Sequence, residues 1–366
     1  MAPLSMPSAT SSTLWSALNI LTKERYDALL QVYGNLDDAA KHLGEELLRG
    51  LGCRQETVVN SLLFLEEFDA DRYDRTLQER GITFLEISDP SYPARLKEIG
   101  DPPPFLYTRG DISILDRPCV GMVGTRQMSP YGRLVTDAFV APFVSAGVVT
   151  VSGLAEGIDA RVAEETMQSG GKTVAVLGHG LGMIFPKKHE QLAEKIVEGG
   201  GLLLTEFPLH AETAKFTFPA RNRIIAGLTL GTVVLEAPEG SGAIITAELA
   251  LEYGRDLFVV PGSIFDSNYA GCHSLIAKGS AKLVTKPADV LQELGMIIPV
   301  DGGISSFVPS SPEEGKLFSI LTSMPQNMDS LLEKSGMETG RINAVLTMME
   351  LSGGAKNAGN GLWVRG

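Results

Sequence analysis

The sequence predicts an α/β protein whose core is a parallel β-sheet, with a small helical domain before it and a winged-helix domain after it. Apolar strands and helical patterns alternate strictly from residue 118 to 295, which is typical of parallel strands covered by helices on both faces. Three more helical patterns and a glycine-rich hairpin follow residue 312. We therefore expect these segments: a helical domain (1–80), a connector (81–117), the core (118–295), a linker (296–312) and a winged-helix domain (313–366).

The first 80 residues read as a series of short helices. Apolar residues lie three and four positions apart, and glycines at 34, 50 and 52 mark breaks. Helical hairpins with glycine turns can hold a DNA backbone, but the excess of acidic residues favours a protein-contact or spacer role. Residues 82–87 then read as a strand. Five prolines between Asp89 and Asp111 predict an ordered, extended connector that leads to the main sheet.

The core is arranged around a strand that ends at Gly124 and a helix that begins at Ser129 and Pro130. Serine is a preferred N-cap and proline suits the first helical position, so the polar loop between them carries Arg126 at the carboxyl end of a strand. In open parallel sheets that edge binds ligands, and a helix N-terminus offers free N–H groups to an anion. Such loops also occur as plain connections, so this loop alone leaves a purely structural role open.

Six further strands follow in the core, each succeeded by a helical pattern. The predicted strands lie near 119–123, 148–152, 173–177, 202–205, 232–235, 256–260 and 282–285. The predicted helices lie near 130–146, 158–169, 188–198, 220–228, 242–254, 271–278 and 287–294. In the last domain we expect helices near 313–322, 329–334 and 338–351 and a strand over 362–365. Its third helix carries Arg341 as its only positive charge, which favours contact with protein over reading of a DNA groove.

Composition limits the class of protein and its compartment. The chain has 366 residues, of which 44% are hydrophobic and 20% charged, as in ordinary globular proteins. It holds no run of about 18 apolar residues and no signal-peptide pattern at its start, so we expect a cytoplasmic protein without a membrane span. The net charge of −13 argues against indiscriminate coating of nucleic acid. Between Glu212 and Glu236, however, the only charged residues are Lys215, Arg221 and Arg223, and such a local patch can still bind a polyanion.

No motif for a cofactor, a metal or a catalytic group is readable. Residues 170–173 (GGKT) lack the first glycine of a phosphate loop and precede a strand instead of a helix. Residues 178–182 (GHGLG) lack the spacing of a dinucleotide fingerprint and the acidic ribose partner. The histidines are scattered, and the three cysteines are too far apart for a zinc site or a disulfide framework. We therefore expect no cofactor, no metal and no catalytic residues.

Four loops should open at the carboxyl edge of the sheet and form a binding site. Their glycines allow close backbone approach, their hydroxyls and helix N-termini receive phosphate oxygens, and their arginines neutralise the charge. Phe216 and Phe218 lie beside two arginines, which suits single-stranded nucleic acid because unpaired bases can stack. Core packing is the alternative role for either phenylalanine. The four loops are 125–126, 152–155, 216–223 and 240–242.

Seven motifs together resemble the DNA-processing protein A (DprA/Smf) family. They are VGTRxxSPYG (123–132), SGLAxGID (152–159), TVAVLG (173–178), FPxRNRIIAG (218–227), SGxxITA (241–247), VPGS (260–263) and GCxxLI (271–276). The Tyr92-Pro93 and Asp101–Pro104 segments are similar to the family as well. Two positions depart from its pattern: Ala163 stands where many members carry a histidine, and Arg161 where a small residue is usual.

The resemblance implies an extended Rossmann-like core with a helical N-terminal domain and a winged-helix C-terminal domain. It also implies a homodimer that binds single-stranded DNA and loads RecA during natural transformation. Together with Thr125 from the first loop, it gives the expected single-stranded DNA contacts: Thr125, Arg126, Ser152, Gly153, Phe218, Arg221, Asn222, Arg223, Ser241, Gly242 and Lys278.

The competing class is an enzyme. The core also resembles, more distantly, the lysine-decarboxylase-like nucleoside monophosphate hydrolases, whose glycine-rich turn, threonine and glutamate compare with residues 240–242, Thr246 and Glu248. Two arginines near such a turn could hold a nucleoside monophosphate in place of a strand. The aromatic and basic segment 215–223 discriminates between the two classes, because a site for a small nucleotide does not need it.

Overall fold

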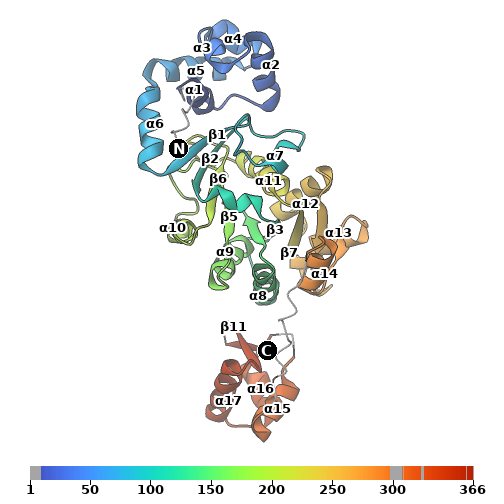
Figure 1. Ribbon diagram of the computed structural model, residues 1–366. Coiled ribbons are helices and arrows are strands. Elements are labelled where there is room, and N and C mark those ends of the chain that lie inside the picture. Colours follow the sequence, from blue (N-terminus) through green and yellow to red (C-terminus); the bar gives the residue numbers. More distant parts are fainter. Residues whose placement is uncertain (1–9, 297–306, 308, 323–324, 360, 366) are drawn as a thin grey trace.

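The computed structural model describes residues 10–296, 307, 309–322, 325–359 and 361–365 of the chain. The helical N-terminal part lies at one end, the α/β core in the middle and the small C-terminal part at the other end (Figure 1). Most of the predicted linker, 296–312, falls outside the described residues. Within the described residues, no helix is long and apolar enough to cross a membrane.

Six short helices form the N-terminal part, and the first five contribute to an apolar cluster around Trp15. Trp15 is fully buried, and its indole N–H donates to the Leu36 carbonyl at 3.2 Å, which ties the first helix to the third. Thr22 and Asn35 cap the second and third helices by accepting from backbone N–H groups. The sequence predicts helices near 15–21, 24–33, 36–43, 56–68 and 70–80; the structure has a helix in each of these regions and adds the six-residue α4. The helices are α1 (Thr10–Leu18), α2 (Lys23–Tyr33), α3 (Leu36–Ala40), α4 (Glu45–Gly50), α5 (Gln55–Glu67) and α6 (Ala70–Glu79).

A nine-stranded sheet forms the centre of the molecule. Its order is β1-β2-β6-β5-β4-β3-β7-β8-β9, and all neighbouring pairs from β6 to β9 are parallel. The parallel α/β core is therefore confirmed, and each of its seven strands lies where the alternation predicted it. They are β3 (Cys119–Gly124), β4 (Val149–Ser152), β5 (Thr173–Val176), β6 (Leu202–Thr205), β7 (Gly231–Glu236), β8 (Asp256–Val259) and β9 (Lys282–Leu283).

The predicted connector, 81–117, contributes two strands to this sheet: the one predicted over 82–87 and a second that was not predicted. β2 (Phe105–Gly110) pairs antiparallel with β6, and β1 (Ile82–Glu86) pairs antiparallel with β2. The sheet is therefore mixed at this edge, and the connector is part of the core. The prolines lie between the two strands, around the short helix α7 (Ala94–Lys97), so they punctuate the segment without excluding strands from it.

Helices cover both faces of the sheet. On one face Phe139 and Phe143 of α8 pack with the strands and with Leu291 of α14. On the other face, Ile224 of α11 and Ala247 of α12 belong to a second apolar cluster. Strands buried on both faces need continuous apolar runs, which the sequence supplies. The core helices are α8 (Pro130–Ser145), α9 (Ile158–Gln168), α10 (Glu190–Glu198), α11 (Thr217–Leu228), α12 (Gly242–Glu252), α13 (Ala270–Ala277) and α14 (Pro287–Glu293).

The chain reverses its winding direction between β3 and β7. β4, β5 and β6 follow on one side of β3, whereas β7 and β8 lie on its other side. Successive connections therefore leave the sheet in opposite directions at the carboxyl ends of β3 and β7, and the helices there diverge. Ligands of open α/β sheets bind in the crevice at such a switch point.

The C-terminal part has the three helices and the hairpin of a winged helix. Arg341 of α17 pairs with Glu313 at 2.6 Å, so the one cation of this helix is already neutralised. The hairpin contacts the core, because Lys356 of β11 lies 3.2 Å from Asp137 of α8. The elements are α15 (Pro312–Ile320), β10 (Gln326–Asn327), α16 (Met328–Ser335), α17 (Thr339–Leu351), β11 (Ala355–Gly359) and β12 (Leu362–Arg365), with sheet order β10-β12-β11.

Candidate nucleic-acid interface

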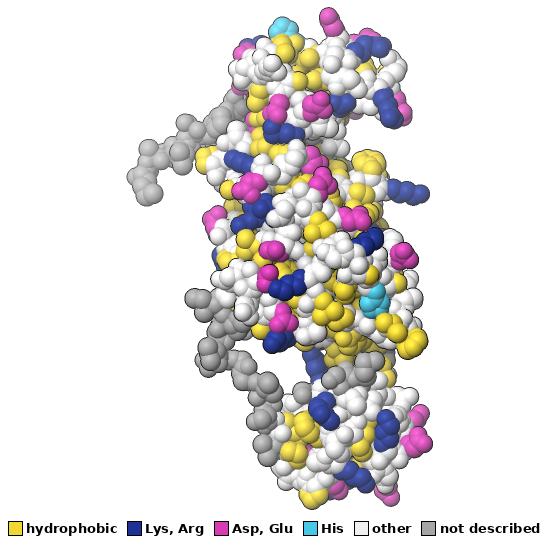
Figure 2. Space-filling view, turned by 90° about the vertical axis from the view of Figure 1, so that its right-hand side faces the viewer, with side chains coloured by type: hydrophobic (Ala, Val, Ile, Leu, Met, Phe, Trp, Pro, Cys, Tyr) yellow, Lys and Arg dark blue, Asp and Glu magenta, His cyan; other side chains and the backbone are white. Residues whose placement is uncertain are grey.

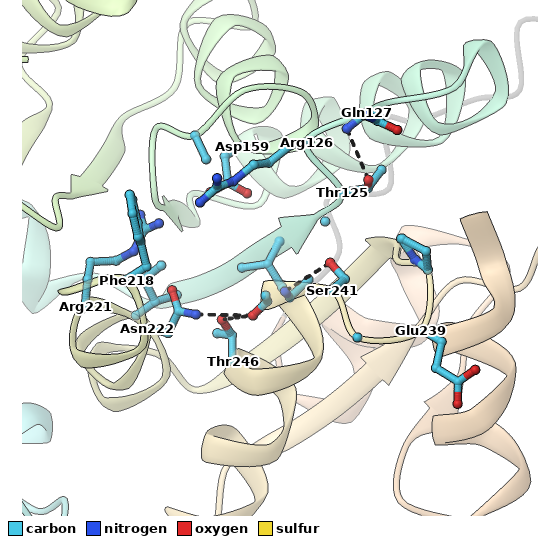
Figure 3. A pocket seen from close by; sticks show the side chains of 18 residues that line it. Thr125, Arg126, Gln127, Asp159, Phe218, Arg221, Asn222, Glu239, Ser241 and Thr246 are labelled. Carbon is cyan, nitrogen blue, oxygen red and sulfur yellow. Dashed lines mark hydrogen bonds between the residues drawn. The ribbon is translucent and has the colours of Figure 1, made fainter. Parts of the chain in front are cut away.

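A cavity of about 430 Å³ lies at the carboxyl edge of the sheet, at the switch point (Figure 3). The loop after β3, the first turns of α11 and the N-terminus of α12 line it. Three segments that are far apart in the sequence thus converge, as expected for this edge of the sheet. The cavity brings together seven of the residues that the sequence predicted: Thr125, Arg126, Phe218, Arg221, Asn222, Ser241 and Gly242.

Hydrogen bonds fix the loop after β3. The Thr125 N–H donates to the Glu236 carbonyl at 2.7 Å, and the Thr125 hydroxyl accepts from the Gln127 N–H at 3.1 Å. Thr125 is consequently buried, while the next residue, Arg126, is exposed. Its guanidinium lies 4.9 Å from the centre of the Phe218 ring, a cation–π contact that holds charge and aromatic surface together.

Arg221 is a buried cation at the wall of the cavity. Its side chain is 5% exposed, its Nη1 donates to the Val176 carbonyl at 2.8 Å, and its Nε has no hydrogen-bond partner among the described residues. The neighbouring Asp159 is also buried and accepts from the Gly153 N–H at 3.1 Å. Burial raises the pKa of Asp159 and lowers the pKa of Arg221, and in each case the other charge opposes the shift.

The charge balance at the cavity favours an anion. Arg126 and Arg221 are two cations, and Asp159 is one buried anion that partly offsets them. Glu239 also belongs to the lining, but Figure 3 shows its side chain directed away from the arginines. The guanidinium of Arg126 is exposed at the cavity, and a guanidinium is a strong partner for phosphate or carboxylate.

The first turns of α11 and α12 are joined at the cavity. The Asn222 side-chain amide donates to the Gly242 carbonyl at 3.2 Å, and the Thr246 hydroxyl donates to the same oxygen at 3.4 Å. Ser241 caps α12 and accepts from the Ala243 N–H at 3.3 Å. Backbone N–H groups at the start of α12 therefore lie at the rim, where the helix favours negative charge.

Arg223 and Lys278, two of the predicted contacts, do not line this cavity. Arg223 pairs with Glu206 and lies 3.4 Å from Asp101 of the former connector. Each residue of a helix is turned by about 100° from the one before it. Arg221 and Arg223 are two positions apart, so they point in nearly opposite directions from α11. Lys278 is exposed at the end of α13 and does not line the cavity.

Ser152 is the last residue of β4, and Gly153 follows it next to the Arg221 side chain. Ser152 is 2% exposed and is not among the lining residues. Gly153 lines a second, smaller cavity that shares Phe218 and Arg221 with the first. A Cβ atom at Gly153 would lie 1.5 Å from Arg221 Nη1, so only glycine leaves room for the buried guanidinium.

The burial of Glu206 beside Arg223 should make the stability of the protein depend on pH. Burial raises the pKa of Glu206 to about 7 from an ordinary 4.5, against the opposing effect of Arg223. Between pH 4.5 and 7 the unfolded chain releases this proton while the folded protein keeps it, so stability falls as pH rises through this window. The Glu206→Gln variant should not show this fall in stability with rising pH. Its unfolding free energy minus that of wild type should therefore rise by on the order of 2 kcal/mol from pH 4.5 to 7.5.

Urea unfolding of both proteins at several pH values measures this difference. A parallel Glu212→Gln variant controls for the general effect of removing one acidic residue nearby. A difference that stays constant with pH would show that the carboxyl group titrates normally in the folded protein.

Sequence reasoning missed Asp159 and Glu236 as parts of the site. Asp159 is within a quoted motif, directly after the Gly157-Ile158 turn into α9, and that position after a strand was the available signal. Glu236 ends β7, is fully buried, and accepts from the Ser129 N–H at 3.1 Å and from the Asn268 amide at 2.9 Å. It thereby helps to fix the N-terminus of α8, but nothing in its local sequence indicates this.

The geometry does not favour the hydrolase alternative. Glu248, which compares with the glutamate of those enzymes, is exposed on α12 and does not line the cavity. Among the described residues there is no group of three His, Cys, Asp or Glu side chains that could hold a metal ion.

On the face drawn in Figure 2, cationic and acidic side chains are interspersed, so that face offers no continuous basic surface.

The chain matches two family models. Residues 83–295, more than half of the chain, match the DNA recombination-mediator protein A model, and residues 307–361 match the DprA winged helix domain. The first match begins within β1, in agreement with a core that includes the two antiparallel strands. Winged-helix identity of the C-terminal part is thus supported by both sequence and structure.

Relatives cover most of the chain. The DNA processing protein DprA of Streptococcus pneumoniae is 39% identical over 75% of this chain and 94% of its own length. Protein Smf of Escherichia coli is 36% identical over 72% of each chain.

Two solved structures agree with this match. The X-ray structure of S. pneumoniae DprA covers 77% of this chain and 96% of its own, with a TM-score of 0.64 and 38% identity. A Helicobacter pylori DprA structure, which concerns the single-stranded DNA binding mode of that protein, covers 58% of this chain and 95% of its own, with a TM-score of 0.53 and 29% identity. The chain therefore belongs to the DNA recombination-mediator protein A (DprA/Smf) family.

Proposed function

We propose that this protein binds single-stranded DNA in the cavity at the switch point. Arg126 and Arg221 hold phosphates, and Phe218 offers its ring to an unpaired base. The observation that carries the proposal is the convergence of two arginines and an aromatic ring on one cavity: Arg221 lines it beside Arg126, whose guanidinium lies on the Phe218 ring. The H. pylori relative, which binds single-stranded DNA, supports the same assignment.

The cavity suits a single strand better than a duplex. In a duplex the bases are paired and stacked, so Phe218 could not reach the face of one without unstacking it. The cavity has two cations, one of them buried, in an acidic protein, whereas duplex binding relies on many phosphate contacts along a surface. We therefore expect a preference for single strands with little dependence on base sequence.

The role of the complex in the cell is proposed on the family assignment. We propose that the protein protects incoming single strands, loads RecA recombinase during transformation or recombination, and works as a homodimer in the cytoplasm. We further propose that it is not an enzyme, because the cavity lining lacks a readable set of general acid, general base and nucleophile.

Binding titrations at several salt concentrations test the DNA-binding proposal. Two arginines line the cavity, so about two phosphates are neutralised, and log K should fall with log salt at a slope of roughly −1.4 for a single strand. Duplex DNA and a nucleoside monophosphate serve as the competing ligands. Equal affinity for duplex and single strand, or tighter binding of the monophosphate, would contradict the proposal.

Removal of residues 305–366 should leave affinity for single-stranded DNA within about twofold of the full chain. The cavity belongs to the core, and the one cation of α17 is engaged by Glu313, so this helix offers no phosphate-binding stripe. Anisotropy titration of both forms measures the ratio, and thermal unfolding confirms that the shortened core is folded. A tenfold loss of affinity in a folded core would mean that the winged helix contacts the strand.

A further inference from the structure

A second cavity of about 240 Å³ adjoins the first one. The two cavities share Arg126, Ala155, Phe218 and Arg221 among their lining residues, so the cation–π pair of Arg126 and Phe218 stands between them. The second cavity has about eight times the volume that one water molecule takes up in the liquid, which leaves room for a small aromatic ring but not for a folded strand.

An aromatic ring that the first cavity lacks lines the second one. Phe185, in the segment between β5 and α10, lines only the second cavity and is 48% exposed. With Phe218 it gives this small cavity two phenylalanine rings. Aromatic side chains of this kind supply the surface on which unpaired bases stack.

His179 fixes the backbone at Phe185 by accepting a hydrogen bond from it. The Phe185 backbone N–H donates to His179 Nε2 at 3.2 Å, so this nitrogen carries no proton. The proton is then on Nδ1, which lies 3.0 Å from the Gly180 carbonyl and donates to it. Burial lowers the pKa of His179, and the ring therefore stays neutral and keeps this arrangement at physiological pH. A fixed backbone at Phe185 reduces the entropy lost when a ligand binds beside its ring.

Charge indicates which part of a strand can enter. Glu156 lines the second cavity but not the first, and Lys188 pairs with it at 2.9 Å, which lowers the pKa of the carboxyl group and keeps it ionised. A carboxylate in the lining disfavours a second phosphate at this place. The same oxygen atoms can accept hydrogen bonds from a nucleobase. Arg126 and Arg221 line both cavities, so the second cavity differs from the first in its smaller volume and in its second phenylalanine ring, Phe185.

We propose that the second cavity is a nucleobase subsite, which takes one unpaired base of a strand whose phosphates lie at Arg126 and Arg221. The base lies beside Phe185, and the Arg126–Phe218 pair separates it from the neighbouring nucleotide. This subsite rests on the proposed single-stranded DNA binding and adds to it a residue, Phe185, outside the four loops that carry phosphate contacts.

A cycle of protein variants and base removal tests the subsite. The probes are an end-labelled oligo(dT) and a chain of equal length in which every base is absent and the phosphate backbone is kept. The ratio of their two dissociation constants measures what the bases contribute. The variants are Phe185→Ala, Phe185→Leu, which keeps apolar volume without the ring, and Met183→Ala. Met183 is a matched control because it is 44% exposed two residues away and lines neither cavity.

In Phe185→Ala the base contribution should fall about tenfold, and in Phe185→Leu by a smaller factor. Affinity for the base-free chain should stay unchanged in both, and Met183→Ala should match wild type on both probes. Thermal unfolding shows whether each variant is folded, and Phe185→Leu keeps the test decisive if Phe185→Ala is not.

Three results would overturn the subsite. If Phe185→Leu and Phe185→Ala leave the base contribution unchanged while wild type binds oligo(dT), the subsite is wrong and the proposed function stands. Equal weakening of both probes would mean that Phe185 only supports the fold of its segment. Failure of wild type to bind either probe would overturn the proposed function together with the subsite.

Discussion

Replacing Arg221 by alanine should weaken binding of single-stranded DNA by about 100-fold. The change removes a guanidinium that lines the cavity and leaves Asp159, a buried carboxylate, without its opposing charge near the phosphate. A charge-assisted hydrogen bond in a buried setting contributes roughly 1.5–3 kcal/mol, and an unpaired buried charge adds to the loss. Anisotropy titration at one salt concentration measures the change in affinity, and a salt series should show a flatter slope.

Two variants separate this effect from a general loss of positive charge. Lys278→Ala also removes one cation, but Lys278 is exposed and outside the cavity, so binding should change by less than about twofold. The double variant Asp159→Asn with Arg221→Ala should recover part of the affinity, because it removes the uncompensated carboxylate. If Arg221→Ala and Lys278→Ala weaken binding equally in folded proteins, the bound strand lies outside this cavity.

Replacing Gly153 by alanine should weaken binding of single-stranded DNA nearly as much, although glycine has no side chain with which to bind. The added methyl group would lie 1.5 Å from Arg221 Nη1, a distance that no real contact allows, so the guanidinium has to leave its place. Arg221 would then also lose its hydrogen bond to the Val176 carbonyl. We expect a loss of at least tenfold in affinity, measured by the same titration, with some loss of thermal stability.

A double variant tests whether this loss acts through Arg221. Gly153→Ala combined with Arg221→Ala should bind no more weakly than Arg221→Ala alone, since the clash has gone with the side chain. Gly50→Ala is a matched control, because a Cβ atom at Gly50 meets no atom within 4 Å. Additive losses in the double variant would show that Gly153 contributes through its backbone, independently of the arginine.

Local patterns predicted the parts of the fold that depend on neighbours in sequence. The apolar runs of β3 to β9 and the Ser129-Pro130 start of α8 are readable because a buried strand and a capped helix each need particular residues in order. The convergence of the loops after β3 and before α11 and α12 followed from the rule that parallel strands end at one edge. Seven of the eleven predicted contacts accordingly line the first cavity, at the switch point.

Long-range pairing explains the parts that the sequence did not reveal. Arg223 looked equivalent to Arg221 in the same motif, but its partners, Glu206 and Asp101, come from two distant segments. The antiparallel edge formed by β1 and β2 likewise depends on the pairing of β2 with β6, about 95 residues later. The proximity of Asp159 and Arg221, whose charges act on each other at the cavity, is of the same kind.

The depth of Arg221 within an acidic protein has a consequence for the speed of binding. The net charge of −13 repels an approaching strand, and a recessed cation acts only over a short distance, about 8 Å at physiological ionic strength. Salt screens the repulsion that slows encounter as well as the attraction that holds the docked strand. Association and dissociation rates should therefore both increase with salt, whereas proteins with an exposed cationic surface associate more slowly. Capture of a strand would then be governed by diffusion into the crevice and not by long-range steering.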